Sequence, residues 1–276
     1  MKVGRIVVVG RPNAGKSTLI NALVGQKISI VTPTPQTTRK TVQGVYWDER
    51  GQVIISDTPG AFLKQHGPIT PPSVESLDQH DLIIYLIDKT RARGEEENRI
   101  LGLVRQSKKP KIIVINKTDV KKPDYIYQYK FLEDEFDAWL EISAKQSQHL
   151  ETLKETVFQF LPEGKPLFDP ETLRAFPALN VTPEEFIAEL IREKAFLVLR
   201  QEIPYEVSVE CEEITEKEKV FVIKATIYTT DEHYRPIIIG KGGQTIKKIG
   251  IMAREEIELI TDKKAFLDLS VKIRKK

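Results

Sequence analysis

The stretch Gly10-Arg11-Pro12-Asn13-Ala14-Gly15-Lys16-Ser17 decides the fold of the first half of this 276-residue chain. It matches the pattern G-x-x-x-x-G-K-[S/T], which forms a loop between a strand and a helix. An apolar, β-branched run precedes it at Arg5 to Val9, and helical spacing of Leu19 and Leu23 follows it. The sequence therefore predicts a strand, a phosphate-binding loop and a helix in succession.

This loop has the chemistry of a nucleotide site. Glycines let successive backbone N–H groups curl around a phosphate, and the helix N-terminus adds its dipole. We expect residues Gly10 to Thr18 to bind nucleotide, with Lys16 as a catalytic residue on the β/γ oxygens and Ser17 as a ligand of Mg²⁺. The alternative is an ordinary glycine turn that caps a helix, and the full match in this context disfavours it.

Short apolar runs continue along the chain, and helical segments alternate with them. Strands are predicted at 53–55, 82–87 and 112–115, and helices at 95–104 and 150–160. This alternation favours an α/β domain with a mostly parallel sheet and helices on both faces. Residues 42–47 and 52–55 are predicted to form one antiparallel hairpin at the sheet edge.

Two further segments are placed to sense the γ-phosphate. Asp57-Thr58-Pro59-Gly60 directly follows a predicted strand, where P-loop enzymes hold a carboxylate that reaches Mg²⁺ and a glycine N–H that faces the γ-phosphate. Thr38, preferred here over Thr37, is the candidate hydroxyl that completes the Mg²⁺ shell. Thr38 and Gly60 are therefore candidate catalytic residues beside Lys16.

The base is predicted to be guanine. Asn116-Lys117-Thr118-Asp119 follows the strand 112–115, at the sheet edge where ligands of open α/β sheets bind. The Asp119 carboxylate can accept from N1–H and the N2 amino group of guanine, which adenine lacks, so an ATPase is disfavoured. Asn116 is expected to tie this loop to the first one, and the Lys117 stem to cover the base. Ser143-Ala144-Lys145 completes the site, with the Ala144 N–H near guanine O6.

The composition changes between residues 162 and 183, where five prolines and a glycine exclude a long helix or central strand. We therefore predict a nucleotide-binding domain at 1–161, a linker at 162–183 and a second domain at 184–276. In the second domain the sequence predicts a helix at 184–200, strands at 205–212 and 219–228, a glycine turn, a helix and a last strand at 265–273. Its order αββααβ indicates a smaller α+β domain.

Gly240-Lys241-Gly242-Gly243 gives this second domain a G-x-x-G loop ahead of a helix. In the order αββααβ this loop is a signature of KH domains, whose glycines let a sugar-phosphate backbone approach closely. A second nucleotide loop or a plain helix-start turn is the alternative. The predicted RNA contacts are Ile239, Gly240, Lys241, Gly242, Gly243, Lys247, Lys248 and Arg254. Lys272, Arg274, Lys275 and Lys276 are candidates to extend that basic surface.

Taken together, the loop 10–17, the Q-T-T-R of 36–39, the D-T-P-G of 57–60, the N-K-T-D of 116–119 and the I-S-A of 142–144 resemble the five boxes of translation-factor-like GTPases. With the KH pattern the whole chain resembles the Era-like GTPases. That resemblance implies GTP and GDP with Mg²⁺ as ligands, and K⁺ near Asn13 as a further candidate. It implies binding of the 3′ region of small-subunit ribosomal RNA, a role in 30S assembly, and slow hydrolysis, because Ala61 stands where Ras-type enzymes use glutamine.

Two other functions stay open from the residues. One is a GTP-gated RNA tether with negligible hydrolysis of its own, and the other is a factor related to tRNA modification. The 42 basic and 40 acidic residues nearly cancel, so an RNA surface must be a local patch, and no DNA partner is expected. Cys211 is the sole cysteine, predicted to be a small core residue. We expect a cytoplasmic monomer without a signal peptide or a membrane-spanning segment, and leave peripheral membrane contact open.

Overall fold

The computed structural model describes residues 1–25, 27–28, 42–57, 73–169, 182–200 and 203–274, and the side chains of Val42 and Asp57 are not among the described parts. The chain divides into two compact units, which are treated separately. Among the described residues, no helix is long and apolar enough to cross a membrane.

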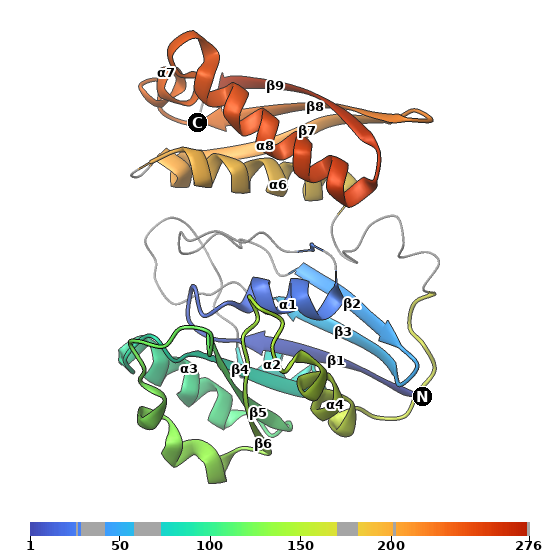
Figure 1. The fold of residues 1–276 in the computed structure, drawn as a ribbon, viewed down its shortest axis with the longest axis vertical. Coiled ribbons are helices and arrows are strands. Elements are labelled where there is room, and N and C mark those ends of the chain that lie inside the picture. The colour runs from blue at the N-terminus through green and yellow to red at the C-terminus, as the bar shows by residue number, and fades with distance from the viewer. Residues whose placement is uncertain (26, 29–41, 58–72, 170–181, 201–202, 275–276) are drawn as a thin grey trace. The chain divides into compact units, whose positions relative to one another are not determined.

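The first unit is built on a six-stranded sheet with the order β2-β3-β1-β4-β5-β6 (Figure 1). Its strands are β1 (Lys2–Val9), β2 (Val42–Asp48), β3 (Gly51–Asp57), β4 (Leu82–Asp88), β5 (Lys111–Asn116) and β6 (Ala138–Glu141). All neighbours are parallel except β2 and β3, which form the predicted antiparallel hairpin at the edge. The carboxyl ends of β1, β4 and β5 therefore meet at one edge, where both predicted nucleotide loops begin.

Helices cover both faces of this sheet. Helices α1 (Lys16–Val24) and α4 (Leu150–Phe160) pack on one face, while α2 (Val74–Asp78), α3 (Glu95–Gln106) and the 3₁₀ segments η1 (Ile126–Gln128) and η2 (Lys130–Glu135) pack on the other. The strands between them are buried, as a sheet covered on both faces requires: every residue of β4 is buried. The α/β fold predicted for this unit is confirmed.

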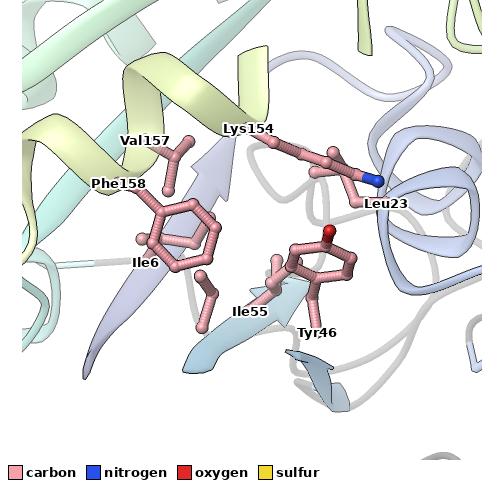
Figure 2. A pocket seen from close by; sticks show the side chains of 8 residues that line it. Ile6, Leu23, Tyr46, Ile55, Lys154, Val157 and Phe158 are labelled. Atoms are coloured by element: carbon pink, nitrogen blue, oxygen red, sulfur yellow. The ribbon is translucent and has the colours of Figure 1, made fainter. Parts of the chain in front are cut away.

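Between α1, α4 and the sheet lies a small apolar pocket (Figure 2). The Lys154 ammonium lies 4.4 Å from the centroid of the Tyr46 ring, and Phe158 approaches the same ring at 6.2 Å between centroids. A nucleotide needs backbone donors, which this apolar lining does not supply, and the Lys154 ammonium is already placed over the Tyr46 ring, so the pocket is a packing gap of the core. Its lining residues are Ile6, Leu23, Tyr46, Val53, Ile55, Lys154, Val157 and Phe158.

The second unit has the helix and strand order αββααβ, as predicted. Its elements are α6 (Pro183–Val198), the 3₁₀ segment η3 (Ile203–Glu206), β7 (Val207–Glu216), β8 (Val220–Thr229), α7 (Tyr234–Ile239), the 3₁₀ turn η4 (Lys241–Gly243), α8 (Gln244–Thr261) and β9 (Lys264–Ile273). The sheet order is β7-β8-β9, with β8 antiparallel to β7 and parallel to β9. Apolar residues of α6 and α8, such as Ile191 and Ala253, pack with Ile227 of β8 to form one core.

Several local features differ from the sequence prediction. Tyr205 lies in η3 rather than at the start of a strand, and the five-residue helix α2 was not predicted, although Ser73 and Ser76 form a capping box at its start. Cys211 is half-buried against the second core rather than fully inside it, because the register of β7 shifts between Cys211 and Glu213. Burial raises the pKa of the Cys211 thiol to about 11.

Candidate nucleotide site and nucleic-acid interface

The loop between β1 and α1 has a shape that requires two of its glycines. A Cβ atom on Gly10 would lie 2.3 Å from the carbonyl oxygen of Leu86, and one on Gly15 would lie 2.3 Å from Nδ2 of Asn116. Gly15 also has a φ of +98°, which side-chain-bearing residues rarely adopt. Together these constraints hold the loop against the sheet edge with its backbone open to an anion, as a phosphate site demands.

Lys16 is buried, and its ammonium is held over this loop. Its Nζ donates to the carbonyl oxygens of Gly10 at 2.9 Å and of Arg11 at 2.9 Å. A lysine that bridges two carbonyls of the same loop is fixed at the place where the loop backbone and helix N-terminus also concentrate positive potential. Its predicted role toward the β/γ oxygens agrees with this position and stays a prediction.

The side chain of Arg11 contacts α3 and the segment before it, which the motif does not indicate. Arg11 is 4% exposed, and its Nε lies 2.5 Å from Oε2 of Glu97 in α3. Its guanidinium also donates to the carbonyl oxygens of Ala92 at 3.1 Å and Arg91 at 3.3 Å. Arg11 was predicted as a nucleotide-binding residue, and the structure leaves only its backbone for that role, because the side chain is committed to α3 and the loop before it.

Asn116 connects the two predicted nucleotide loops. It ends β5, is 2% exposed, donates from Nδ2 to the carbonyl oxygen of Ala14 at 2.8 Å, and accepts at Oδ1 from the N–H of Ala144 at 3.0 Å. The expected tie between Asn116 and the first loop is present, and the same amide also fixes the Ser143-Ala144-Lys145 loop. Three segments far apart in sequence are thereby brought to one site.

The carboxylate of Asp119, which is predicted to select guanine, accepts a hydrogen bond from a buried side chain. The hydroxyl of Ser143 donates to Oδ1 of Asp119 at 2.6 Å and accepts from the N–H of Gln146 at 3.1 Å. This hydrogen bond orients the Asp119 carboxylate without neutralising it. Ser143 is itself completely buried, so its rotamer is fixed by packing.

Lys117 is positioned by a residue that the sequence reading missed. Lys117 has a φ of +67°, and its Nζ lies 2.6 Å from Oδ2 of Asp88, which is 1% exposed at the end of β4. The other Asp88 oxygen accepts from the N–H of Thr90 at 2.9 Å and from its hydroxyl at 2.6 Å. The ion pair extends the Lys117 stem across the site, as covering a base requires. An acidic residue at the carboxyl end of a buried parallel strand was the available signal.

The remaining predicted residues of the first site are distributed as follows. Asn13 is exposed with a φ of +63°, and Pro12, Ser17 and Thr18 are partly exposed along the loop and the start of α1. Asp57 ends β3, and only its backbone is described. Lys145 is exposed beside the Asp119 loop. The candidates Thr38, Thr58, Pro59 and Gly60 lie outside the described residues.

In the second unit, the predicted G-x-x-G loop connects α7 to α8. Gly240, Gly242 and Gly243 all have positive φ, at +77°, +59° and +78°. A Cβ on Gly240 would lie 2.2 Å from Oγ1 of Thr245, whereas Cβ atoms on Gly242 and Gly243 would meet nothing within 4 Å. Gly240 thus closes the turn, and the other two glycines leave open space into which a sugar-phosphate backbone fits.

Exposed basic side chains lie on this loop and along α8. Lys241, Lys247, Lys248 and Arg254 are exposed, and Lys247 and Arg254 share one face of α8 because they are seven residues apart. Ile239 is half-buried, at the margin of the core. Lys272 and Arg274 contribute little net charge, because Lys272 lies 3.7 Å from Glu212 and Arg274 pairs with Glu210. Lys275 and Lys276 lie outside the described residues.

The comparisons with known proteins match both units of the chain. A family model described as 50S ribosome-binding GTPase matches residues 5–117, and a KH domain model matches residues 202–276. The chain is 41% identical to GTPase Era of Halothermothrix orenii over 99% of its length and 94% of that protein, and 37% identical to GTPase Era of Borreliella afzelii over 100% and 95%.

Two solved structures are similar over the full chain. One is a variant of Aquifex aeolicus Era bound to GDP and AlF₄⁻, with a TM-score of 0.86, 36% identity and coverage of 100% of this chain and 95% of that one. The other is Era with MgGDPNP and nucleotides 1506–1542 of 16S ribosomal RNA, with a TM-score of 0.86, 36% identity and coverage of 100% and 94%.

Fold and site therefore define a P-loop GTPase joined to a C-terminal KH domain. Identity of 37–41% over almost the whole length of this chain places it more narrowly: it belongs to the GTPase Era family.

Proposed function

We propose that this chain is a GTP-controlled switch that holds the 3′ region of small-subunit ribosomal RNA in its KH groove and assists assembly of the 30S subunit. The observation that supports RNA binding is the G-x-x-G loop, in which Gly242 and Gly243 face open space beside exposed lysines. The family relative that binds nucleotides 1506–1542 of 16S ribosomal RNA supports this choice of RNA.

In the nucleotide half, the proposed ligands are GTP and GDP with Mg²⁺. The backbone of the loop 10–17 and Lys16 hold the phosphates, Ser17, Thr38 and Asp57 hold Mg²⁺, and Asp119 with Ala144 reads guanine. Bound Mg²⁺ supplies positive charge to the phosphate oxygens. The first loop fits this ligand, because a Cβ on Gly10 or Gly15 would collide with neighbouring groups, so the loop keeps the narrow shape that presents backbone N–H groups. The proposed domain boundaries are 1–161 and 184–276, with the connection at 162–183.

K⁺ is a proposed second cation near Asn13, because Asn13 presents an exposed side chain from the loop itself. A monovalent cation there adds positive charge as the γ-phosphate leaves. Single-turnover hydrolysis is then faster in K⁺ than in Na⁺ of the same concentration, and equal rates contradict this proposal. We also propose that the protein acts as a monomer in the cytoplasm.

The RNA assignment is tested with a fluorescent RNA that matches the 3′ end of small-subunit ribosomal RNA, in the presence of a GTP analogue or GDP. The informative pair is Gly242→Asp and Gly242→Asn. A Cβ atom at this position meets nothing within 4 Å, and Asp and Asn have nearly the same shape and tolerate positive φ better than most residues, so the two variants share one backbone strain. They differ in one negative charge, which repels phosphate.

We expect wild type to bind most tightly with the GTP analogue, Gly242→Asn to bind somewhat less well, and Gly242→Asp to lose at least about tenfold in affinity. An unrelated RNA of equal length is the control for specificity. Equal binding of both variants contradicts the groove assignment. Equal binding with GTP analogue and GDP contradicts the switch, and tight RNA binding without measurable hydrolysis favours the GTP-gated tether. Preference for a tRNA over the ribosomal RNA favours the modification factor.

A further inference from the structure

Two loops of the nucleotide-binding unit hold each other through reciprocal hydrogen bonds. The side chain of Arg11, in the loop 10–17, donates to the carbonyl oxygens of Ala92 and Arg91, in the segment between β4 and α3. The side chain of Arg91 in turn donates from Nη1 to the carbonyl oxygen of Pro12 at 3.0 Å. Three hydrogen bonds between side chain and backbone therefore fasten the first half of the phosphate-binding loop to the start of α3.

A buried carboxylate holds Arg11 in this position. Glu97 is 1% exposed in the first turn of α3, and its Oε2 lies 2.5 Å from Nε of Arg11. The hydroxyl of Tyr85 donates to Oε1 at 2.5 Å, and the hydroxyl of Tyr129 donates to Oε2 at 3.3 Å. A buried ion pair adds little net stability compared with apolar packing of the same shape, so stability alone does not explain why these charges are buried here.

The backbone of Arg11 also contacts the ammonium of Lys16. Its carbonyl oxygen is one of the two that accept from Nζ of Lys16, at 2.9 Å. The Arg11 side chain is anchored to α3, so the same residue fixes its own backbone and the lysine that rests on it. A loss of the anchor frees the carbonyl, and with it Lys16 and the N–H groups of the following residues.

From this arrangement we infer that Arg11, Arg91 and Glu97 are positioning residues that keep the phosphate-binding loop in its anion-binding shape by clamping it to α3. None of the three side chains is placed on the phosphates. They act through the backbone of residues 10–12 and through Lys16. The inference rests on the proposed use of the loop 10–17 for phosphate binding.

The test measures the dissociation rate and affinity of fluorescent GDP, and kcat and KM for GTP, in the full-length protein. Arg11→Met keeps the side-chain length and removes the clamp. We expect GDP to dissociate at least about tenfold faster, equivalent to ~1.4 kcal/mol, with a higher KM and a lower kcat because Lys16 is also displaced. The matched control is Arg105→Met, which removes an arginine of α3 whose pair with Glu135 is exposed and far from the loop in sequence.

Arg11→Met leaves Glu97 buried without its partner, which alone lowers stability. The double variant Arg11→Met and Glu97→Gln removes both charges and keeps an amide oxygen that can accept from the Tyr85 hydroxyl. We expect its thermal stability to recover while GDP dissociation stays fast. Recovery of both together contradicts the inference, since the pair would then serve only the fold.

Arg91→Met tests the same clamp from the surface, because Arg91 is 44% exposed and its loss leaves no buried charge. We expect several-fold faster GDP dissociation with unchanged thermal stability. If Arg91→Met and a folded Arg11→Met both release GDP as slowly as wild type, the inference is wrong. If wild type itself does not bind GDP, the proposed nucleotide site fails instead, so the two failures are distinguishable.

Discussion

Asn116 donates a hydrogen bond from Nδ2 to the carbonyl oxygen of Ala14 at 2.8 Å, across 102 positions of sequence. The same side chain accepts from the N–H of Ala144, so a single amide sets the distance between the loop 10–17 and the Ser143-Ala144-Lys145 loop. A substitution of Asn116 can test the two contacts separately, because its donor binds one loop and its acceptor binds the other.

Asn116→Asp keeps the acceptor for Ala144 and replaces the donor by an oxygen that faces the Ala14 carbonyl. Two buried acceptors then oppose each other, and a buried hydrogen-bonding group without its partner costs roughly 1–3 kcal/mol. We expect GDP affinity to fall roughly 10- to 100-fold by fluorescence titration. Asn98→Asp is the control, because the exposed Asn98 of α3 acts as an acceptor for Arg93 and keeps that role. A similar loss in both variants contradicts the prediction.

Gly15→Ala and Gly25→Ala separate a collision from backbone strain. Both glycines have positive φ, at +98° and +75°, but only at Gly15 does the new Cβ meet a neighbour, at 2.3 Å from Nδ2 of Asn116. We expect Gly25→Ala to lower the free energy of unfolding by about 1–2 kcal/mol with unchanged GDP binding. Gly15→Ala is expected to abolish tight GDP binding, because Asn116 must move away from Ala14. Equal nucleotide affinity of the two variants is the result that contradicts this account.

His80 makes the stability of the first unit depend on pH. Its Nε2 lies 3.0 Å from the hydroxyl of Ser56 in β3, and its Nδ1 lies 3.0 Å from the carbonyl oxygen of Ser76 in α2. Burial lowers the pKa of His80 below its ordinary value, and the nearby charge of Arg5 acts in the same direction, against the hydrogen bonds to the carbonyl oxygens of Ser76 and Leu77.

Because the fold favours neutral His80, its contribution to stability is present above the ordinary pKa of about 6.5 and is lost as pH falls from there through the lowered folded value. We expect the thermal midpoint of wild type to decline below ~pH 6.5 more steeply than that of His80→Gln, which cannot be protonated there. His233→Gln, at an exposed position, is the control. Parallel pH profiles of wild type and His80→Gln contradict the prediction.

The parts of this molecule that could be predicted from sequence are those where the residue type itself is the signal. The loop at Gly10 to Ser17, the N-K-T-D at 116–119 and the glycines at 240–243 need particular backbone conformations or donors, so their letters indicate their structure. The alternating strands and helices were equally accessible, because burial on both faces of a parallel sheet leaves a continuous apolar run such as Leu82 to Ile87.

What could not be predicted depends on long-range geometry. Arg11 belongs to a loop motif that suggests phosphate binding. Only the tertiary structure shows that its side chain forms an ion pair with Glu97 of α3. Asp88 is an unremarkable acid until the fold places it 2.6 Å from Lys117. The bulge after Cys211 and the pairing of Arg274 with Glu210 likewise arise from strand register, which local periodicity does not specify.

Asp119→Asn tests the choice of base. The carboxylate at Asp119 accepts hydrogen bonds, whereas an amide presents one acceptor and one donor, so it opposes a guanine donor and matches a base with an oxygen at C2, such as xanthine. We expect GTP and GDP affinity to fall by at least about 10²-fold, and xanthosine nucleotides to bind more tightly than guanosine nucleotides. Ser143 can still donate to the retained amide oxygen, so the loop stays in place.

The measurement is a competition titration of fluorescent GDP against GDP, xanthosine diphosphate and ADP, for wild type, Asp119→Asn and the exposed control Asp134→Asn. The control is expected to keep the wild-type order of affinities. Unchanged preference for GDP in Asp119→Asn shows that another group reads the base. Equal loss of all three nucleotides shows that Asp119 supports the loop rather than selecting guanine. Only an inverted order of GDP and xanthosine diphosphate agrees with direct recognition by this carboxylate.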